Sequence, residues 1–249
     1  MIAVVVGLFG LVIGSFLNVV IRRVPIRQSI VWPSSKCPSC GERIKSLDNL
    51  PVLSYLMLRG QCRSCKARIS PRYPLVEAVA GILLALAAYE FGLSLSLAWA
   101  LVLISALVVL AGTDLEHRLL PNAIVGPAAV VGFLLSAIVD PDGWWVYPVS
   151  AVAVAAGLLA LALAYPGGMG MGDVKMGGML GAFLGPYAAL AVFIGSLVGA
   201  LVSGVLMVTG AIERGRALPF GLFLALAGVL TLFLGQDVWG WYLRLVRVA

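Results

Sequence analysis

Residues 95–114 read LSLAWALVLISALVVLAGTD, an uncharged apolar run that ends directly in a carboxylate. About 20 consecutive apolar residues can cross the hydrocarbon core of a bilayer as one helix. The chain as a whole has a similarly apolar composition: 61% of its 249 residues are hydrophobic and only 11% are charged. Backbone polar groups must be satisfied inside lipid, and these runs lack the alternation of a membrane barrel. The sequence therefore predicts a bundle of membrane-spanning helices.

Eight spans are expected along the chain. Residues 176–211 should form two short spans with a turn at Gly185-Pro186, because Lys175 before them and Arg214 and Arg216 after them favour the same side of the membrane. The other spans are expected at about 2–21, 74–90, 95–113, 120–139, 147–165 and 219–235. The predicted fold class is thus an all-α polytopic membrane protein with about eight transmembrane helices and a cytoplasmic zinc-ribbon-like loop between the first and the second. The expected domains are the first transmembrane helix 1–21, the loop 22–73 and a transmembrane bundle 74–249.

The basic residues of the chain predict its topology. Residues 22–73 hold eleven of the seventeen Lys and Arg residues. The positive-inside rule places this loop in the cytoplasm and both termini outside. Nucleic acid is an alternative partner for a basic loop, but topology explains the charge with fewer assumptions, so we expect contacts with membrane lipid and no nucleic acid. The same topology puts Asp114 and Asp173 at the cytoplasmic surface of the membrane.

All four cysteines lie in this loop, as Cys37-Pro38-Ser39-Cys40 and Cys62-Arg63-Ser64-Cys65. Two such pairs at this separation are typical of a four-thiolate zinc site. Disulfides are the alternative, but the cytoplasm is reducing. Four protein ligands leave the metal no open position, so Cys37, Cys40, Cys62 and Cys65 are expected to hold a structural Zn²⁺.

Apolar residues between the two cysteine pairs predict a short helix. Leu50, Leu53, Leu56, Met57 and Leu58 could lie against the bilayer surface, or they could pack against the zinc ribbon itself. The pattern does not separate these two interpretations.

Asp114 and Asp173 are the leading candidates for chemistry. Two carboxylates that share a site cannot both ionise easily, so one keeps a proton and the pair can act as acid and base. Gly170 and Gly172 flank Asp173, and glycine permits close backbone approach or a positive φ. The alternative is structural: each aspartate caps a helix, or pairs with Arg118 or Lys175.

Other polar residues near the membrane boundary are secondary candidates. Glu116 competes with Asp114 but lies on a different helix face. His117, the only histidine, is expected at the interface rather than as a base or ligand. Glu77, just inside the second span, needs a partner that the sequence does not identify.

These motifs, in this order and spacing, resemble the bacterial type IV prepilin peptidases over nearly the whole chain. The segments that carry the resemblance are 14–23 (GSFLNVVIRR), both cysteine pairs, 69–77 (ISPRYPLVE), the Asp114 stretch with Pro121, the stretch 170–175 (GMGDVK) and 217–221 (ALPFG).

The resemblance implies an aspartic endopeptidase of the bacterial inner membrane that removes the leader peptide of type IV prepilins or pseudopilins at the cytoplasmic face. It maps the catalytic pair onto Asp114 and Asp173, and Gly170, Gly172, Lys175 and Glu116 are expected to support the substrate site. Relatives with the cysteine loop also methylate the new N-terminus with S-adenosylmethionine, so this second activity is an expectation here. The loop contains no glycine-rich nucleotide fingerprint that would locate the methyl donor.

Three rival functions make different predictions. A proton-coupled transporter using the two aspartates as relay groups would place them near mid-membrane and show repeats, which the sequence lacks. A non-catalytic zinc-ribbon adaptor would not need either aspartate. A presenilin-like protease shares the Gly-x-Gly-Asp feature but none of the other matching segments.

Overall fold

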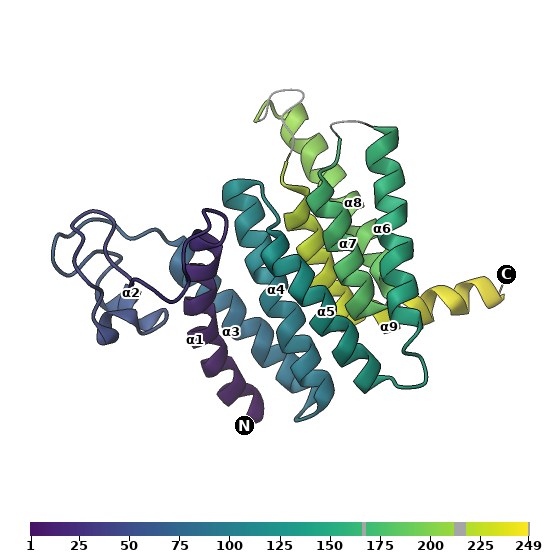
Figure 1. The fold of residues 1–249 in the computed structure, drawn as a ribbon, viewed down its shortest axis with the longest axis horizontal. Coiled ribbons are helices and arrows are strands. Elements are labelled where there is room, and N and C mark those ends of the chain that lie inside the picture. The colour runs from purple at the N-terminus through teal and green to yellow at the C-terminus, as the bar shows by residue number, and fades with distance from the viewer. Residues whose placement is uncertain (166–167, 212–217, 249) are drawn as a thin grey trace. The chain divides into compact units, whose positions relative to one another are not determined.

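The computed structural model describes residues 1–165, 168–211 and 218–248, apart from the side chains of Ser46 and of 246–248 (Figure 1). Over these residues the chain is helical, and its only strand-like pairing consists of two isolated β-bridges in the cysteine loop. The helices are α1 (Ile2–Arg23), η1 (Ser46–Asn49), α2 (Leu53–Met57), α3 (Arg72–Phe91), α4 (Leu95–His117), α5 (Asn122–Val139), α6 (Val146–Ala164), α7 (Met171–Leu184), α8 (Tyr187–Val208) and α9 (Phe220–Val248).

The all-α membrane fold predicted from the sequence is confirmed. Seven helices of the described residues are long and apolar enough to cross a membrane, namely α1, α3, α4, α5, α6, α8 and α9. The eighth expected span corresponds to the short helix α7. The helix ends at Gly185, where φ is +56°, and Pro186 follows just before α8. Glycine accepts this backbone conformation readily, and proline suits the start of the next helix.

Helix α9 is longer than the span expected there. The last span was expected to end near residue 235, but α9 continues to Val248, because the segment after Gly235 contains no proline and remains rich in apolar residues. Arg214 and Arg216, on which part of the predicted topology depends, lie outside the described residues. The predicted domain ranges 1–21, 22–73 and 74–249 remain predictions.

The chain divides into two compact units, residues 1–97 and 98–249. In the first unit α1 packs along α3, and small residues allow a close approach (Figure 1). A Cβ atom on Gly14 would lie 2.7 Å from Glu77 Cα, and one on Gly10 would lie 2.9 Å from Gly81 Cα. Small residues at such contacts are the usual means of packing helices in a membrane. The cysteine loop connects these two helices.

In the second unit α7 is the central helix. It contacts α5, α6, α8 and α9, and nearly all its residues from Asp173 onward are buried. Phe183, Met176 and Leu180 are fully buried in the core, together with Leu107 of α4 and Leu224 of α9. A 14-residue helix surrounded by others suits a position inside the bundle, and its first turn carries Asp173.

The contact between α6 and α7 allows a test of this packing. A Cβ atom on Gly181 would lie 2.5 Å from the backbone N and Cα atoms of Ala151, whereas one on Gly157 would meet nothing within 4 Å. We expect Gly181→Ala to destabilise the purified protein by about 1–3 kcal/mol, because the backbones must separate. The matched variant Gly157→Ala should be neutral or slightly stabilising. Thermal unfolding in detergent measures both, and equal melting temperatures would contradict the packing.

Candidate functional site

Asp114 is in the last turn of α4 and is only 6% exposed. Its Oδ2 atom accepts a hydrogen bond of 2.9 Å from the backbone N–H of Leu222, in the first turn of α9. The first N–H groups of a helix lack partners within the helix and carry a partial positive charge, so they suit a carboxylate. Gly221 makes this approach possible, because a Cβ atom there would lie 2.9 Å from Asp114 Oδ2.

Asp173 is in the first turn of α7 and is 9% exposed. Its Oδ2 atom accepts a hydrogen bond of 3.1 Å from the N–H of Gly170, the residue that precedes the helix. The backbone N–H of Asp173 in turn donates to the carbonyl oxygen of Gly170. The carboxylate therefore stabilises the start of its own helix.

The structure brings the two carboxylates together. They lie close enough for their charges to interact. Leu120, in the connection between α4 and α5, lies against the start of α7 and the start of α9. A Cβ atom on Gly172 would lie 3.0 Å from Leu120 Cβ, and one on Gly221 would lie 2.9 Å from Leu120 Cδ2. The glycines beside Asp173 and Asp114 thus contact the same leucine.

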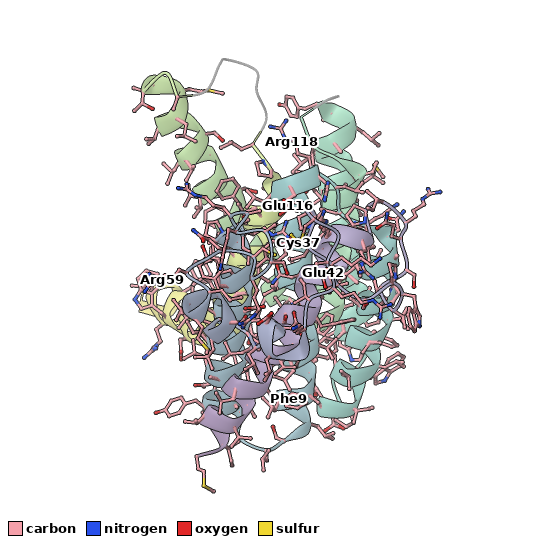
Figure 2. The ribbon with its side chains drawn as sticks, turned by 90° about the vertical axis from the view of Figure 1, so that its left-hand side faces the viewer. Phe9, Cys37, Glu42, Arg59, Glu116 and Arg118 are labelled. Atoms are coloured by element: carbon pink, nitrogen blue, oxygen red, sulfur yellow. The ribbon has the colours of Figure 1, made fainter. Side chains whose placement is uncertain are left out.

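The other predicted site residues lie around this pair. Gly172 makes the close approach expected of it, whereas Gly170 has a φ of −83° and so does not adopt the positive φ that was one explanation for its presence. Lys175 donates to Asn122 Oδ1 over 3.0 Å, which links α7 to the start of α5. Glu116 Oε2 lies 3.7 Å from His117 Nε2. Figure 2 labels Glu116 and Arg118 where α4 ends.

Sequence analysis missed the residues that hold the pair in place. The Leu222 N–H reaches Asp114 across 108 positions of sequence, and Leu120 is simply the first residue of the expected span 120–139. Pro219-Phe220-Gly221 carried a usable signal, since a proline just before a run of apolar residues marks a helix start with free N–H groups. The capping alternative is correct in part, because both aspartates accept N–H groups at helix starts.

The four cysteines form one cluster in the loop of the first unit. All four thiols are free, and their sulfur atoms lie within 4.8 Å of one another. Cys37 Sγ and Cys65 Sγ are 3.8 Å apart, which is about the sulfur–sulfur separation in a tetrahedral site with Zn–S bonds of about 2.3 Å. The donor set therefore fits Zn²⁺.

Each cysteine pair is a tight turn of the backbone. The Cys37 N–H donates to the carbonyl of Glu42, and Cys62 donates in the same way to Ala67 (Figure 2 labels Cys37 and Glu42). Backbone N–H groups of Cys40 and Ser39 hydrogen-bond to the Cys37 sulfur and lower its pKa to about 6. A thiolate at neutral pH is the form that binds metal. The turn around Cys37 therefore favours the thiolate of that residue, whereas burial and the neighbouring thiols raise the pKa of Cys40.

Three of the apolar residues between the cysteine pairs are largely exposed. Leu53, Leu56 and Met57 of α2 are 59%, 65% and 78% exposed. This exposure favours the bilayer-surface alternative for the short helix. In the same loop the Arg63 guanidinium binds the Asp48 carboxylate and lowers the pKa of that group.

A cavity of about 550 Å³ lies in the first unit, between the α1–α3 pair and the cysteine loop. Residues of α1 (Ser15, Asn18, Arg22), of the loop (Tyr55) and of α3 (Tyr73, Glu77) are among those that line it. Glu77 has its partner here, since its Oε2 atom accepts the N–H of Val52 over 2.7 Å.

The fold and the site together define a polytopic membrane protein with two interacting, buried aspartates and a four-cysteine loop. A family model described as "Bacterial Peptidase A24 N-terminal domain" matches residues 8–91, and one described as "Type IV leader peptidase family" matches residues 101–236. The chain belongs to the type IV leader peptidase family.

Curated relatives match along almost the full chain. The proteins named prepilin leader peptidase/N-methyltransferase of Stutzerimonas stutzeri, Pseudomonas putida and Bacillus subtilis (strain 168) are 34%, 37% and 35% identical to it. These alignments cover 96%, 95% and 96% of this chain and 93%, 92% and 96% of the relatives. No solved structure matches the chain.

The cysteine cluster generates a prediction about metal content. We expect purified protein to contain one zinc ion per chain, and Cys65→Ser to remove most of it, because three thiolates bind zinc less tightly than four. Ser39→Ala, in the turn between Cys37 and Cys40, should keep the metal. Elemental analysis after gel filtration measures both variants, and zinc-free wild-type protein in which the cysteines form disulfides would contradict the assignment.

Proposed function

We propose that this protein is a membrane-embedded aspartic endopeptidase that removes the leader peptide of type IV prepilins or pseudopilins and then N-methylates the new N-terminus. The observation that carries the peptidase proposal is the pair of buried carboxylates, Asp114 and Asp173, which separate helices bring within interaction distance. The relatives named prepilin leader peptidase/N-methyltransferase support both activities and the class of substrate.

The proposed mechanism is that of a paired-carboxylate protease. One aspartate is ionised and takes a proton from a water molecule, whose oxygen attacks the carbonyl carbon of the scissile bond. The other aspartate donates its proton to the carbonyl oxygen. Collapse of this tetrahedral diol breaks the C–N bond: the leaving amine takes the proton from the first aspartate, while a hydroxyl group of the diol returns its proton to the second aspartate. Both groups thus return to their starting protonation states together.

The fixed geometry of the pair supports this mechanism. The N–H groups of Leu222 and Gly170 each hold one carboxylate oxygen, so the carboxylates do not need to reorganise when charge moves between them. The low exposure of both side chains limits water access, which strengthens electrostatic interactions within the site.

The proposed location is the bacterial inner membrane, with the site at the cytoplasmic face. The basic residues of the loop 22–73 support cytoplasmic placement of that loop. Asp114 and Asp173 each lie at the end of a helix rather than in its middle, as expected for a site at the membrane surface. A prepilin whose apolar stem is inserted in the bilayer would present its leader junction at this depth.

Two bound groups belong to the proposal. Zn²⁺ on Cys37, Cys40, Cys62 and Cys65 would stabilise the loop, since it leaves no open coordination position. S-adenosylmethionine supplies a methyl group on a positively charged sulfur. Transfer of this methyl group to the new N-terminal amine would leave the donor as a neutral thioether and would release one proton from the nitrogen to water.

Replacing either aspartate tests the peptidase proposal. We expect Asp114→Asn and Asp173→Asn each to lower cleavage of a purified prepilin by about a hundredfold to ten-thousandfold, the usual contribution of a positioned acid or base. Asp142→Asn, which changes an exposed aspartate at the other end of α5, should cleave at the wild-type rate. Intact mass spectrometry follows the reaction, and full cleavage by both single variants would exclude the aspartic mechanism.

The contact of Gly221 with Asp114 makes a finer prediction. A Cβ atom on Gly221 would displace the Asp114 carboxylate or the α9 start, because Asp114 Oδ2 would lie at 2.9 Å. We expect Gly221→Ala to lower kcat by about a hundredfold, as small misplacements of reacting groups do. Gly126→Ala, where a Cβ atom would meet nothing within 4 Å, is the matched control. Equal rates for these two variants would show that the position of Asp114 is not critical.

A further inference from the structure

Helix α9 is longer than a membrane crossing requires. It has 29 residues, whereas about 20 residues span the hydrocarbon core of a bilayer. Gly235 is buried, and a Cβ atom there would lie 3.6 Å from the Cβ atom of Tyr187 at the start of α8. Of residues 236–245, all but Gly240 are exposed, and a Cβ atom on Gly240 would meet nothing within 4 Å. The helix therefore leaves the bundle after Gly235, and Figure 1 shows its last turns, in yellow, running away from α6, α7 and α8.

These last turns, residues 236–248, are called the tail helix here, and their sequence is amphipathic. Residues three or four apart lie on the same face of a helix. Asp237, Gly240, Arg244 and Arg247 follow this spacing and form one polar face, next to Gln236. The other positions are apolar or aromatic: Val238, Trp239, Trp241, Tyr242, Leu243, Leu245, Val246 and Val248. Arginines on one face and aromatic and aliphatic residues on the other are typical of a helix that lies in the plane of a membrane interface.

Three aromatic side chains of the tail helix are left uncovered by the rest of the chain. Trp239, Trp241 and Tyr242 are each about half exposed. The rings of Trp239 and Tyr242, one helical turn apart, pack on each other with their centroids 5.7 Å apart. Trp and Tyr are enriched at the headgroup level of a bilayer, where the apolar ring meets lipid and the N–H or O–H group meets polar atoms. The exposed rings therefore indicate lipid headgroups as their surroundings.

The place of the tail helix along α9 agrees with this depth. The start of α9 holds Asp114 through the Leu222 N–H group, so the tail helix is at the opposite end from the aspartate pair. At about 1.5 Å per residue, residues 220–235 cover about 24 Å, most of the roughly 30 Å thickness of the hydrocarbon core. The tail helix therefore begins close to the membrane face opposite the two aspartates.

The two arginines of the tail helix give it a chemical preference. The expected topology places the C-terminus outside, where the positive-inside rule disfavours basic residues, so Arg244 and Arg247 need another explanation. Residues 236–248 carry a net charge of +1, from these two arginines and Asp237. Arg244 is exposed, and its Nε atom donates to the carbonyl oxygen of Gly240 over 3.2 Å, on the polar face. Guanidinium groups bind phosphate oxygens through paired N–H groups, so this face suits the phosphates of a lipid surface.

We propose that the tail helix lies in the headgroup region of the membrane face opposite the two aspartates, where its arginines bind the phosphates of anionic phospholipids. A second copy of the chain and another protein are the alternative occupants of the exposed apolar face. Lipid is favoured over both because the aromatic rings, the arginines and the distance along α9 all match the same depth of a bilayer.

Photocrosslinking in a bilayer identifies what covers this face. Trp241 of the full-length protein is replaced by p-benzoylphenylalanine, and the protein is reconstituted in vesicles of phosphatidylcholine and phosphatidylglycerol. Mass spectrometry identifies the adducts formed on illumination. We expect lipid adducts attached near the glycerol end of the acyl chain, with phosphatidylglycerol enriched at least about fivefold over its share of the vesicle, the factor that one arginine at an anionic surface provides. The same photoprobe in place of Leu201, an exposed residue of α8, is the matched control and should give adducts in the proportions of the vesicle.

Changes at the arginines test the recognition of phosphate. With the photoprobe at position 241, the double variant Arg244→Gln/Arg247→Gln should lose the enrichment of phosphatidylglycerol, because both guanidinium groups are gone. Arg244→Lys/Arg247→Lys keeps both charges and should retain most of the enrichment. Melting temperatures in detergent check that each double variant is folded.

Several results would overturn the proposal. Adducts at position 241 with a second copy of the chain, or with another protein, would make this face a protein interface. Lipid adducts in the same proportions as at position 201, or attached at the methyl end of the acyl chain, would remove the anionic headgroup site. An enrichment that survives in folded Arg244→Gln/Arg247→Gln protein would show that the arginines do not recognise the lipid.

Discussion

The constraint on which this structure depends is the burial of two carboxylates in a bundle of apolar, membrane-spanning helices. Asp114 and Asp173 are each less than a tenth exposed. Such groups need hydrogen-bond donors, and the fold supplies them from the backbone at helix starts: Leu222 at the start of α9 and Gly170 before α7. Backbone donors do not change charge with pH and cannot rotate away, so they hold the oxygens without neutralising them.

This use of helix starts explains several features of the second unit. Helix α7 is short and contacts four other helices, and Asp173 in its first turn is only 9% exposed. Gly172 and Gly221 have no side chains at the points where Leu120 and the Asp114 carboxylate approach. Leu120, in the connection between α4 and α5, therefore lies against the glycines beside both acids. The first unit shows a related arrangement, in which the backbone N–H of Val52 holds Glu77 beside the cavity.

Local patterns in the sequence predicted much of this molecule. Apolar runs predicted the seven helices that are long enough to cross a membrane and the shorter helix α7, including the break at Gly185-Pro186, because hydrophobicity and turn residues act over a few positions. The spacing of Cys37, Cys40, Cys62 and Cys65 gave a cluster that the structure brings together. The parts that could not be predicted depend on contacts between distant segments. The backbone N–H groups of Leu222 and Val52 donate to the carboxylates of Asp114 and Glu77. Every residue type except proline has a backbone N–H group, so the side chains at positions 222 and 52 give no signal in the sequence. The exposure of Leu53, Leu56 and Met57 likewise follows from tertiary packing and not from their periodicity.

The central claim is that Asp114 and Asp173 act on one reacting centre. An experimental structure with a prepilin peptide whose scissile carbonyl is replaced by a hydroxyl-bearing tetrahedral carbon tests it most directly. We expect the hydroxyl oxygen to lie about 3 Å from a carboxylate oxygen of each aspartate, the hydrogen-bond distance at which acid and base groups act. A peptide whose hydroxyl contacts only one aspartate, or binds away from both, would contradict the account.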